Sequence, residues 1–336
     1  MDVRAEEAMT AALRVLRLAG VVVKGGDLKV VSIIDPVEHR VRDLTWRPTT
    51  SSNILNSRHN TFERAASTLF VVETVSQDDI LITAAHELKL NLVVLNPPRV
   101  LLDGNSAAPA GPVNAQVRAR RLGRAAVGRW AIERALVLAR VPRSQGELAQ
   151  DAGLTQQAVS YALQRPLREG SVTKNPSGFI IPRSRRSSAI DNWLEEYPGA
   201  LGVETYWYGL SDPVEQDNLI VRYAHEMDAR ALVSGDGAAD HYAPWRKPAS
   251  SVVYLSELLD LTAADLVPAA QREDATVTAI VPRDHTIWAT AVRDGSSDRY
   301  VDPLIALWDL TRYGHGSDVD EAAAKLRAAI IDRSHP

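Results

Sequence analysis

The 336-residue chain contains no cysteine. This absence excludes disulfide bonds, thiolate metal ligands and thiol nucleophiles together, and it is typical of proteins in a reducing compartment. No apolar run approaches the ~20 residues that a membrane-spanning helix needs. The first residues are acidic and amphipathic, unlike a secretory signal peptide. We therefore expect a cytoplasmic protein.

Motifs for metal or nucleotide chemistry are also missing. The eight histidines show no ligand spacing, and no P-loop or serine-hydrolase motif is present. The composition, 45% hydrophobic and 24% charged, is ordinary for a globular protein, and the length predicts two or three domains. We expect no cofactor, no metal and no catalytic residue of the protein's own.

The net charge of −4 is divided unevenly along the chain. Residues 118–186 hold 14 Lys or Arg against 4 Asp or Glu, a net charge of +10, and the remainder carries −14. A basic segment on an acidic body is the pattern expected for contact with phosphate.

That basic segment contains the pattern of a winged helix-turn-helix, at residues 143–182. Ser144 and Glu147 form a capping box at a helix start, and Gly153 suits the turn after that helix. Thr155 then caps a second helix. A further helix at Trp130–Arg140 precedes the pair, and two short strands, Ser171–Lys174 and Gly178–Ile181, form the wing.

In the second helix, Val159, Leu163 and Leu167 recur at helical spacing and predict a buried stripe. The opposite face carries polar side chains of the kind that read base edges. These candidate reading residues are Gln156, Gln157, Ser160, Tyr161 and Gln164, beside the capping Ser144 and Thr155. The candidate phosphate contacts are Arg143, Arg165, Arg168 and Lys174, with Arg120, Arg121, Arg183, Arg185 and Arg186 in flanking clusters.

Two residues in this motif depart from the expected pattern. Pro166 removes a backbone donor and predicts a kink, or a helix end near Gln164. Ser171 stands where an apolar residue usually precedes the wing strand. A helical hairpin without a ligand remains the alternative interpretation.

We divide the chain into a small α/β domain (1–106), a basic linker (107–124), the winged helix-turn-helix (125–184) and a C-terminal α/β domain (185–336). Within these, the pattern predicts a hairpin turn at Gly25–Gly26 and a helix at 60–68. It also predicts a loop at 183–188 and a strand at 287–292.

An enzyme is the alternative from another class. Asp27–Lys29 and Glu87–Lys89 match the short Asp/Glu-x-Lys pattern of metal-dependent nucleases, and Asp35 and Glu38 are further acidic candidates. Ser234–Ala239 follows a strand and opens a helix, as a phosphate-binding turn of a nucleotidyltransferase does. Neither pattern has a complete set of ligands.

Several stretches together resemble the AbiEi-type antitoxins, transcriptional regulators of type IV toxin–antitoxin systems. They are Ser144–Lys174, Ala189–Tyr197, Ala231–Trp245 with Val252–Leu255, and Val301–Leu326, with a vaguer match over Asn91–Asn105. The resemblance implies a degenerate restriction-endonuclease-like N-terminal domain, a winged helix-turn-helix and a C-terminal antitoxin domain.

The expected function is therefore sequence-specific binding of double-stranded DNA by a transcriptional regulator without catalysis. The alternative is a metal-dependent nuclease or nucleotidyltransferase that uses a terminal α/β domain. The resemblance also implies a cognate toxin as a partner. Paired half-sites favour a homodimer or a cooperative pair on DNA.

Overall fold

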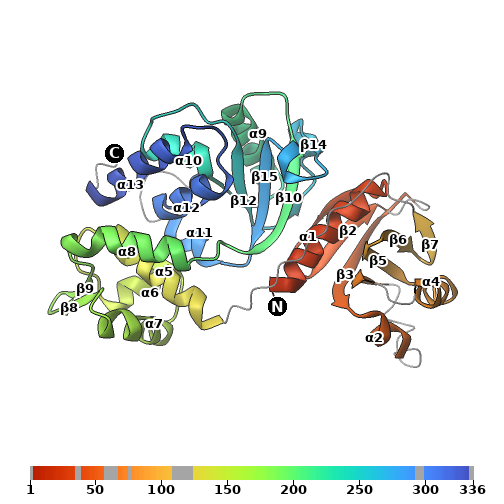
Figure 1. Cartoon of the computed structure of the whole chain (residues 1–336), viewed down its shortest axis with the longest axis horizontal. Helices are drawn as coiled ribbons and strands as arrows, with labels where there is room; N and C mark the ends of the chain where they lie inside the picture. The colour runs from red at the N-terminus through yellow and green to blue at the C-terminus, as the bar shows by residue number, and fades with distance from the viewer. Residues whose placement is uncertain are drawn as a thin grey trace.

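The computed structural model describes residues 3–34, 39–56, 67–74, 78–107, 124–291 and 299–332. It is a mixed α/β protein with three sheets over these ranges (Figure 1). Asp35, Glu38, most of the predicted 60–68 helix and the linker with Arg120 and Arg121 lie outside the described residues. Within them, every helix is too short or too polar to act as a membrane span.

The N-terminal sheet has the strand order β13-β1-β2-β3-β4-β5-β6-β7. Helix α1 packs on one face through Met9 and Leu13, and Ile54 and Leu81 cover the other face. Strands β3, β4 and β5 are mutually parallel. The elements are α1 (Val3–Leu18), β1 (Val23–Gly26), β2 (Val30–Ile34), β3 (Val41–Thr49), α2 (Ser51–Asn56), β4 (Thr68–Thr74), α4 (Asp78–Glu87), β5 (Asn91–Asn96), β6 (Pro98–Leu102), β7 (Asn105–Ala107) and β13 (Leu258–Leu259).

The predicted hairpin of β1 and β2 is present, but its turn lies at Asp27–Lys29, because Gly25 and Gly26 are the last residues of β1. They pair with Leu259 and Leu258 of β13, a strand from the far end of the chain. A Cβ on Gly25 would fall 2.9 Å from the Leu258 carbonyl oxygen. The glycines therefore permit a close strand contact, which joins the N-terminal sheet to the C-terminal half.

The winged helix-turn-helix pattern is present as α5 (Arg124–Leu138), α6 (Gln145–Ala152), α7 (Gln156–Arg168), β8 (Thr173–Asn175) and β9 (Gly178–Ile180). The predicted caps are confirmed. Ser144 Oγ accepts a hydrogen bond from Glu147 N at 3.2 Å, and Glu147 Oε2 accepts from Ser144 N at 2.7 Å. Gly153 adopts a left-handed φ of 64°.

Helix α7 continues through Pro166 to Arg168, so the predicted end near Gln164 is wrong. Pro166 lies in the last turn, where few later helical bonds depend on it, and its ring is buried. Ser171 donates from Oγ to the Pro166 carbonyl oxygen at 3.1 Å, and Ser171 N donates to the same oxygen at 3.0 Å. Ser171, the polar residue before the wing, thus provides two hydrogen-bond donors for a backbone carbonyl in the last turn of α7.

The C-terminal sheet has the order β11-β12-β15-β10-β14. Strand β12 is buried on both faces: Val252 and Tyr254 join one core, and Val253 and Leu255 join the core beneath α9. The elements are β10 (Gly202–Tyr208), α9 (Pro213–Glu226), β11 (Ala231–Ser234), α10 (Gly235–Tyr242), β12 (Ser251–Leu255), β14 (Val267–Pro268), β15 (Val277–Pro282), α11 (Thr286–Ala291), α12 (Pro303–Tyr313) and α13 (Val319–Asp332).

Two predicted elements are corrected. Residues 286–291 form helix α11, not a strand, because Asp284 Oδ1 accepts from Thr286 N at 3.0 Å and starts a helical turn. Residues 183–188 are not a loop but the first turns of α8 (Arg183–Glu196), which begins after Pro182. Pro182 is the N-cap residue, with φ −56° and ψ 143°.

One continuous core spans the winged helix-turn-helix and the C-terminal sheet. It includes Leu148 and Val159 from the helix pair, Trp193 from α8, and Ile287 and Leu304 from α11 and α12. The sequence-based boundary between 184 and 185 therefore falls inside a single packed unit.

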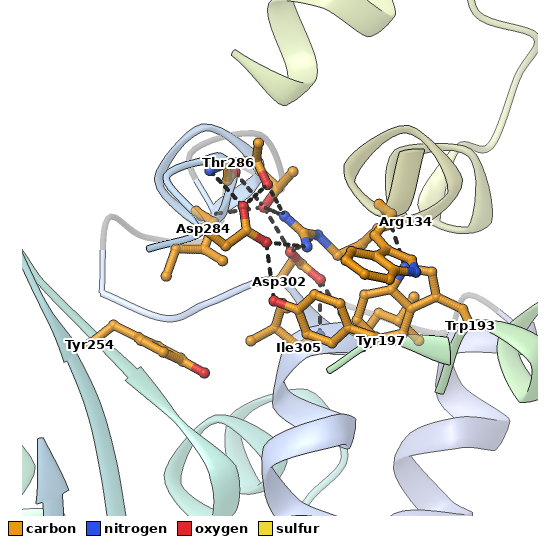
Figure 2. A network of polar contacts seen from close by, with 12 residues as sticks. Arg134, Trp193, Tyr197, Tyr254, Asp284, Thr286, Asp302 and Ile305 are labelled. Carbon is orange, nitrogen blue, oxygen red and sulfur yellow. Dashed lines mark hydrogen bonds and ion pairs between the residues drawn. The ribbon is translucent and has the colours of Figure 1, made fainter. Parts of the chain in front are cut away.

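Arg134 of α5 lies at the centre of this unit and is fully buried (Figure 2). Its Nε is 2.9 Å from Asp302 Oδ2, and its Nη1 is 3.6 Å from Asp284 Oδ2. Nη2 donates to Thr286 Oγ1 at 3.0 Å and to Thr290 Oγ1 at 3.2 Å. Burial alone would lower the pKa of Arg134, but attraction by the two carboxylates outweighs it and raises the pKa.

Aromatic side chains surround the ion cluster. Tyr197 donates to Asp284 Oδ2 at 3.1 Å and stacks on Trp193 with ring centroids 4.2 Å apart. The Trp193 indole donates to the Trp130 carbonyl oxygen at 3.0 Å. Residues from α5, α8 and the C-terminal segment are thus bonded to one another as well as packed (Figure 2).

Replacing Arg134 by Ala leaves Asp284 and Asp302 buried without their cation. We expect the free energy of unfolding to fall by about 3–5 kcal/mol, as for other buried pairs that lose one member. Urea denaturation measures this. Arg140→Ala, at an exposed arginine just after α5, is the matched control, and equal losses in both variants would contradict the assigned role of the cluster.

Candidate nucleic-acid interface

The outward face of α7 carries the predicted reading residues. Gln156, Gln157, Ser160, Tyr161 and Gln164 are all exposed. Tyr161 has 67% of its surface accessible, unusual for a large aromatic side chain. The opposite stripe is buried at Val159 and Leu163, as expected, and partly buried at Leu167. The predicted polar face is therefore a continuous exposed surface.

The wing lies next to this helix. Strands β8 and β9 pair from Thr173↔Ile180 to Asn175↔Gly178. Asn175 Oδ1 accepts from Ser177 N at 3.0 Å and closes the tight turn. Residue Arg143 adds a third pairing, because its backbone exchanges two 2.8 Å hydrogen bonds with Phe179. The segment before α6 thereby fixes the wing against the helix pair.

Ser144 and Thr155 have their hydroxyls engaged as helix caps. Thr155 Oγ1 accepts from Ala158 N at 3.2 Å. Their immediate role is to start α6 and α7, which sets the position of the exposed face.

Two of the four arginines and lysines expected on phosphate already have acidic partners. Arg143 pairs with Glu147 at 3.3 Å and with Asp151 at 3.2 Å. Arg165 pairs with Glu169 at 2.7 Å and with Glu196 of α8 at 3.1 Å. Glu196 also binds Arg129 at 2.5 Å. The surface around α7 is therefore less positive than the residue count of the segment indicates.

Four other basic residues have no acidic partner within the described part of the chain. Arg168 and Arg183 are exposed, and neither side chain has a hydrogen bond or ion pair within the described part of the chain. Lys174 is exposed on the wing, with Nζ 5.7 Å from the centroid of the Phe179 ring. Arg185 is exposed and donates to the Gly170 carbonyl oxygen at the end of α7.

Arg186 does not belong to this surface. It is only 3% exposed and donates to the Ala139 carbonyl oxygen at 3.3 Å. Burial, together with the nearby charge of Arg183, lowers its pKa. The predicted phosphate contact by Arg186 is therefore wrong. Its hydrogen bond instead links α8 to the end of α5.

A cleft of about 1050 Å³ opens beside the first turns of α7. Thr155, Gln157 and Tyr161 line it from α7, and the Asp27–Lys29 turn lines it from the N-terminal sheet. His285, at the start of α11, is on a third side. One flank of the exposed face of α7 therefore lies opposite the N-terminal domain across this cleft.

The residues considered for metal-dependent cleavage have local structural roles. Asp27 Oδ1 accepts from Lys29 N at 2.7 Å and Val30 N at 2.8 Å, which closes the β1–β2 turn. Glu87 ends α4, and Lys89 has a positive φ of 50° in the following turn. Across the described residues, no three His, Cys, Asp or Glu side chains gather as metal ligands do.

The glycine turn at Ser234–Ala239 is tightly packed. Asp236 is paired with Arg246 at 2.6 Å, and Ser234 Oγ donates to Asp309 Oδ2 at 2.5 Å. A Cβ on Gly237 would fall 2.6 Å from Asp217 Oδ2. The polar side chains of this turn are therefore bonded within the protein, and the glycine permits the close approach of α9.

Two buried carboxyls near this turn have strongly shifted pKa values. Burial raises the pKa of Asp309 to about 7, although Ser234 and Tyr254 donate to it. Burial likewise raises the pKa of Asp217 to about 7, although Ser251 donates to it. Sequence patterns gave no sign of either group, because their burial depends on α9 and α12 packing over the sheet.

No protein family, curated protein or solved structure matches the chain.

The shifted carboxyls predict a pH dependence of stability. Between an unfolded pKa of ~3.9 and the folded value, the folded Asp309 holds a proton that the unfolded chain has released. The free energy of unfolding should therefore fall as the pH rises through this range to about 7. Asp309→Asn cannot ionise, so the decline should be shallower in this variant.

Urea denaturation at several pH values between about 5 and 8 tests the slope, and Glu195→Gln, an exposed carboxyl on α8, serves as the control. A wild-type slope unchanged by Asp309→Asn would show that this carboxyl titrates normally.

Proposed function

We propose that this protein is a sequence-specific double-stranded DNA-binding regulator that reads its site with α7. The observation that carries the proposal is the exposed face of Gln157, Ser160, Tyr161 and Gln164 on α7, held beside a two-stranded wing. Amide, hydroxyl and aromatic groups on one helix face suit base edges in the major groove, which admits one α-helix.

Exposed basic side chains around α7 support contact of the same surface with the DNA phosphates. Arg168 extends from the last turn of α7, Lys174 from the wing and Arg183 from the first turn of α8, and all three are exposed. Such residues hold phosphates and set the register of the helix on the duplex. Arg143 and Arg165 can contribute to phosphate binding only after their ion pairs with acidic side chains are broken.

The antitoxin type is a narrower part of the proposal and rests on the resemblance of the sequence. It adds a cognate toxin as partner and binding to paired half-sites as a homodimer or cooperative pair. Catalysis is not part of the proposed function.

Selection on random or genomic DNA, repeated at two salt concentrations, tests the proposal. The double variant Gln157→Ala and Tyr161→Ala should relax the selected sequence, whereas Arg168→Ala or Lys174→Ala should weaken all sequences and lower the salt slope by about 1 each. Gln150→Ala, at an exposed glutamine on α6, is the control for the reading residues. Arg222→Ala on α9 is the control for charge. Equal effects from reading residues and controls would refute the assigned face.

A second prediction concerns Glu196, which forms ion pairs with both Arg129 and Arg165. Hydrogen bonds from these arginines lower its pKa despite partial burial, so it is charged at neutral pH. Glu196→Gln removes a negative charge and one acidic partner from each arginine, while Arg129 keeps Glu133 and Arg165 keeps Glu169. We expect DNA binding to tighten severalfold at low salt.

Glu195→Gln changes the same charge on the neighbouring residue of α8 without removing an acidic partner from Arg129 or Arg165. Fluorescence anisotropy with labelled duplex compares the two variants. Equal affinities in both would contradict a restraining role for Glu196.

A further inference from the structure

We propose that the cavity between α1 and the C-terminal sheet is a binding site for a small organic ammonium ion. This cavity has a volume of about 400 Å³, within the range of small-molecule sites. Thr10 and Arg14 line it from α1, Glu204 and Tyr206 from β10, and Trp308 from α12. The proposal concerns a different surface from α7 and does not depend on DNA binding.

The carboxylate of Glu204 is the central feature of the cavity. Its two oxygens each accept one tyrosine hydroxyl: Tyr206 donates to Oε2 at 2.8 Å and Tyr313 donates to Oε1 at 2.7 Å. Over the described ranges, no Lys, Arg or His nitrogen lies within ion-pair distance of Glu204. A half-buried carboxylate with both oxygens oriented, and without a cation, is a preformed acceptor for a charged donor.

Aromatic rings form the walls around this carboxylate. Tyr206, Tyr313 and Trp308 line the cavity with Tyr254. Arg272, which does not line the cavity, already lies over the Tyr313 ring with its guanidinium carbon 4.3 Å from the centroid, so a ligand has to use the other rings. Aromatic rings close to a carboxylate are groups that bind ammonium ions.

Two arginines in the lining indicate which ammonium compounds the cavity can bind. Arg312 is exposed and lines the cavity together with Arg14, whose Nε donates to the Ala270 carbonyl oxygen at 2.6 Å. A ligand whose ammonium group binds Glu204 therefore also has an exposed guanidinium on the wall of the same cavity. Simple ammonium ions and amino-acid zwitterions share the ammonium chemistry, and the second class adds a carboxylate that Arg312 can meet.

Calorimetric titration of the full chain tests the proposal with three probes. Choline supplies an ammonium alone, L-leucine supplies an ammonium with a carboxylate, and 3,3-dimethyl-1-butanol is the uncharged counterpart of choline. At least one of the two ammonium compounds should bind, and the alcohol should bind at least about tenfold more weakly. Preference for leucine over choline would assign the zwitterion class, and the reverse preference would assign the simple cation.

Glu204→Gln keeps an oxygen acceptor for a tyrosine hydroxyl but removes the charge, and it should weaken binding at least about tenfold. Glu257→Gln, at an exposed glutamate after β12, should leave binding unchanged. In the wild-type chain, the ligand should also shift the NMR signal of the Trp308 indole N–H, which reports on the site even if Glu204→Gln misfolds. Failure of both ammonium compounds to bind, equal binding of the alcohol, or an unshifted Trp308 signal would overturn the proposal.

Discussion

The buried contact of Arg134 with Asp284 and Asp302 determines how the rest of the structure is assembled. A guanidinium with no exposed surface is stable only where carboxylates compensate its desolvation. Here the two carboxylates come from the segments that start α11 and α12, while the guanidinium comes from α5 (Figure 2). The helix-turn-helix is therefore built on the C-terminal half rather than linked to it by a flexible segment.

Several features of the interface follow from this attachment. Helix α8 follows the wing, contributes Trp193 to the shared core and ends at Glu196, which reaches back to Arg165 on α7. Tyr197, directly after the helix, joins the same core. The same helix thus contacts α7 and neutralises part of its charge. At the other side of the molecule, β13 joins the N-terminal sheet through Gly25 and Gly26.

The sequence predicted those features whose causes are local. Ser144, Glu147, Gly153 and Thr155 act within four residues of themselves, so the caps and turn of the helix pair were predictable from spacing alone. The exposed face of α7 followed from helical periodicity. In contrast, the partner of Arg165 at Glu196, the burial of Arg186 and the pairing of Gly26 with Leu258 depend on residues far away in the chain. Charge counting also overstated the basic surface, because it does not register which arginines are paired or buried.

The central claim is that the outward face of α7 contacts DNA bases. Its most direct test is photo-crosslinking with a benzophenone amino acid placed at Tyr161, and in a second variant at Tyr208, an exposed tyrosine on β10. The duplex is the sequence selected by the wild-type protein. We expect crosslinks from position 161 to bases within that sequence and none from position 208. Absence of crosslinks from 161, or equal crosslinking from both positions, would contradict the account.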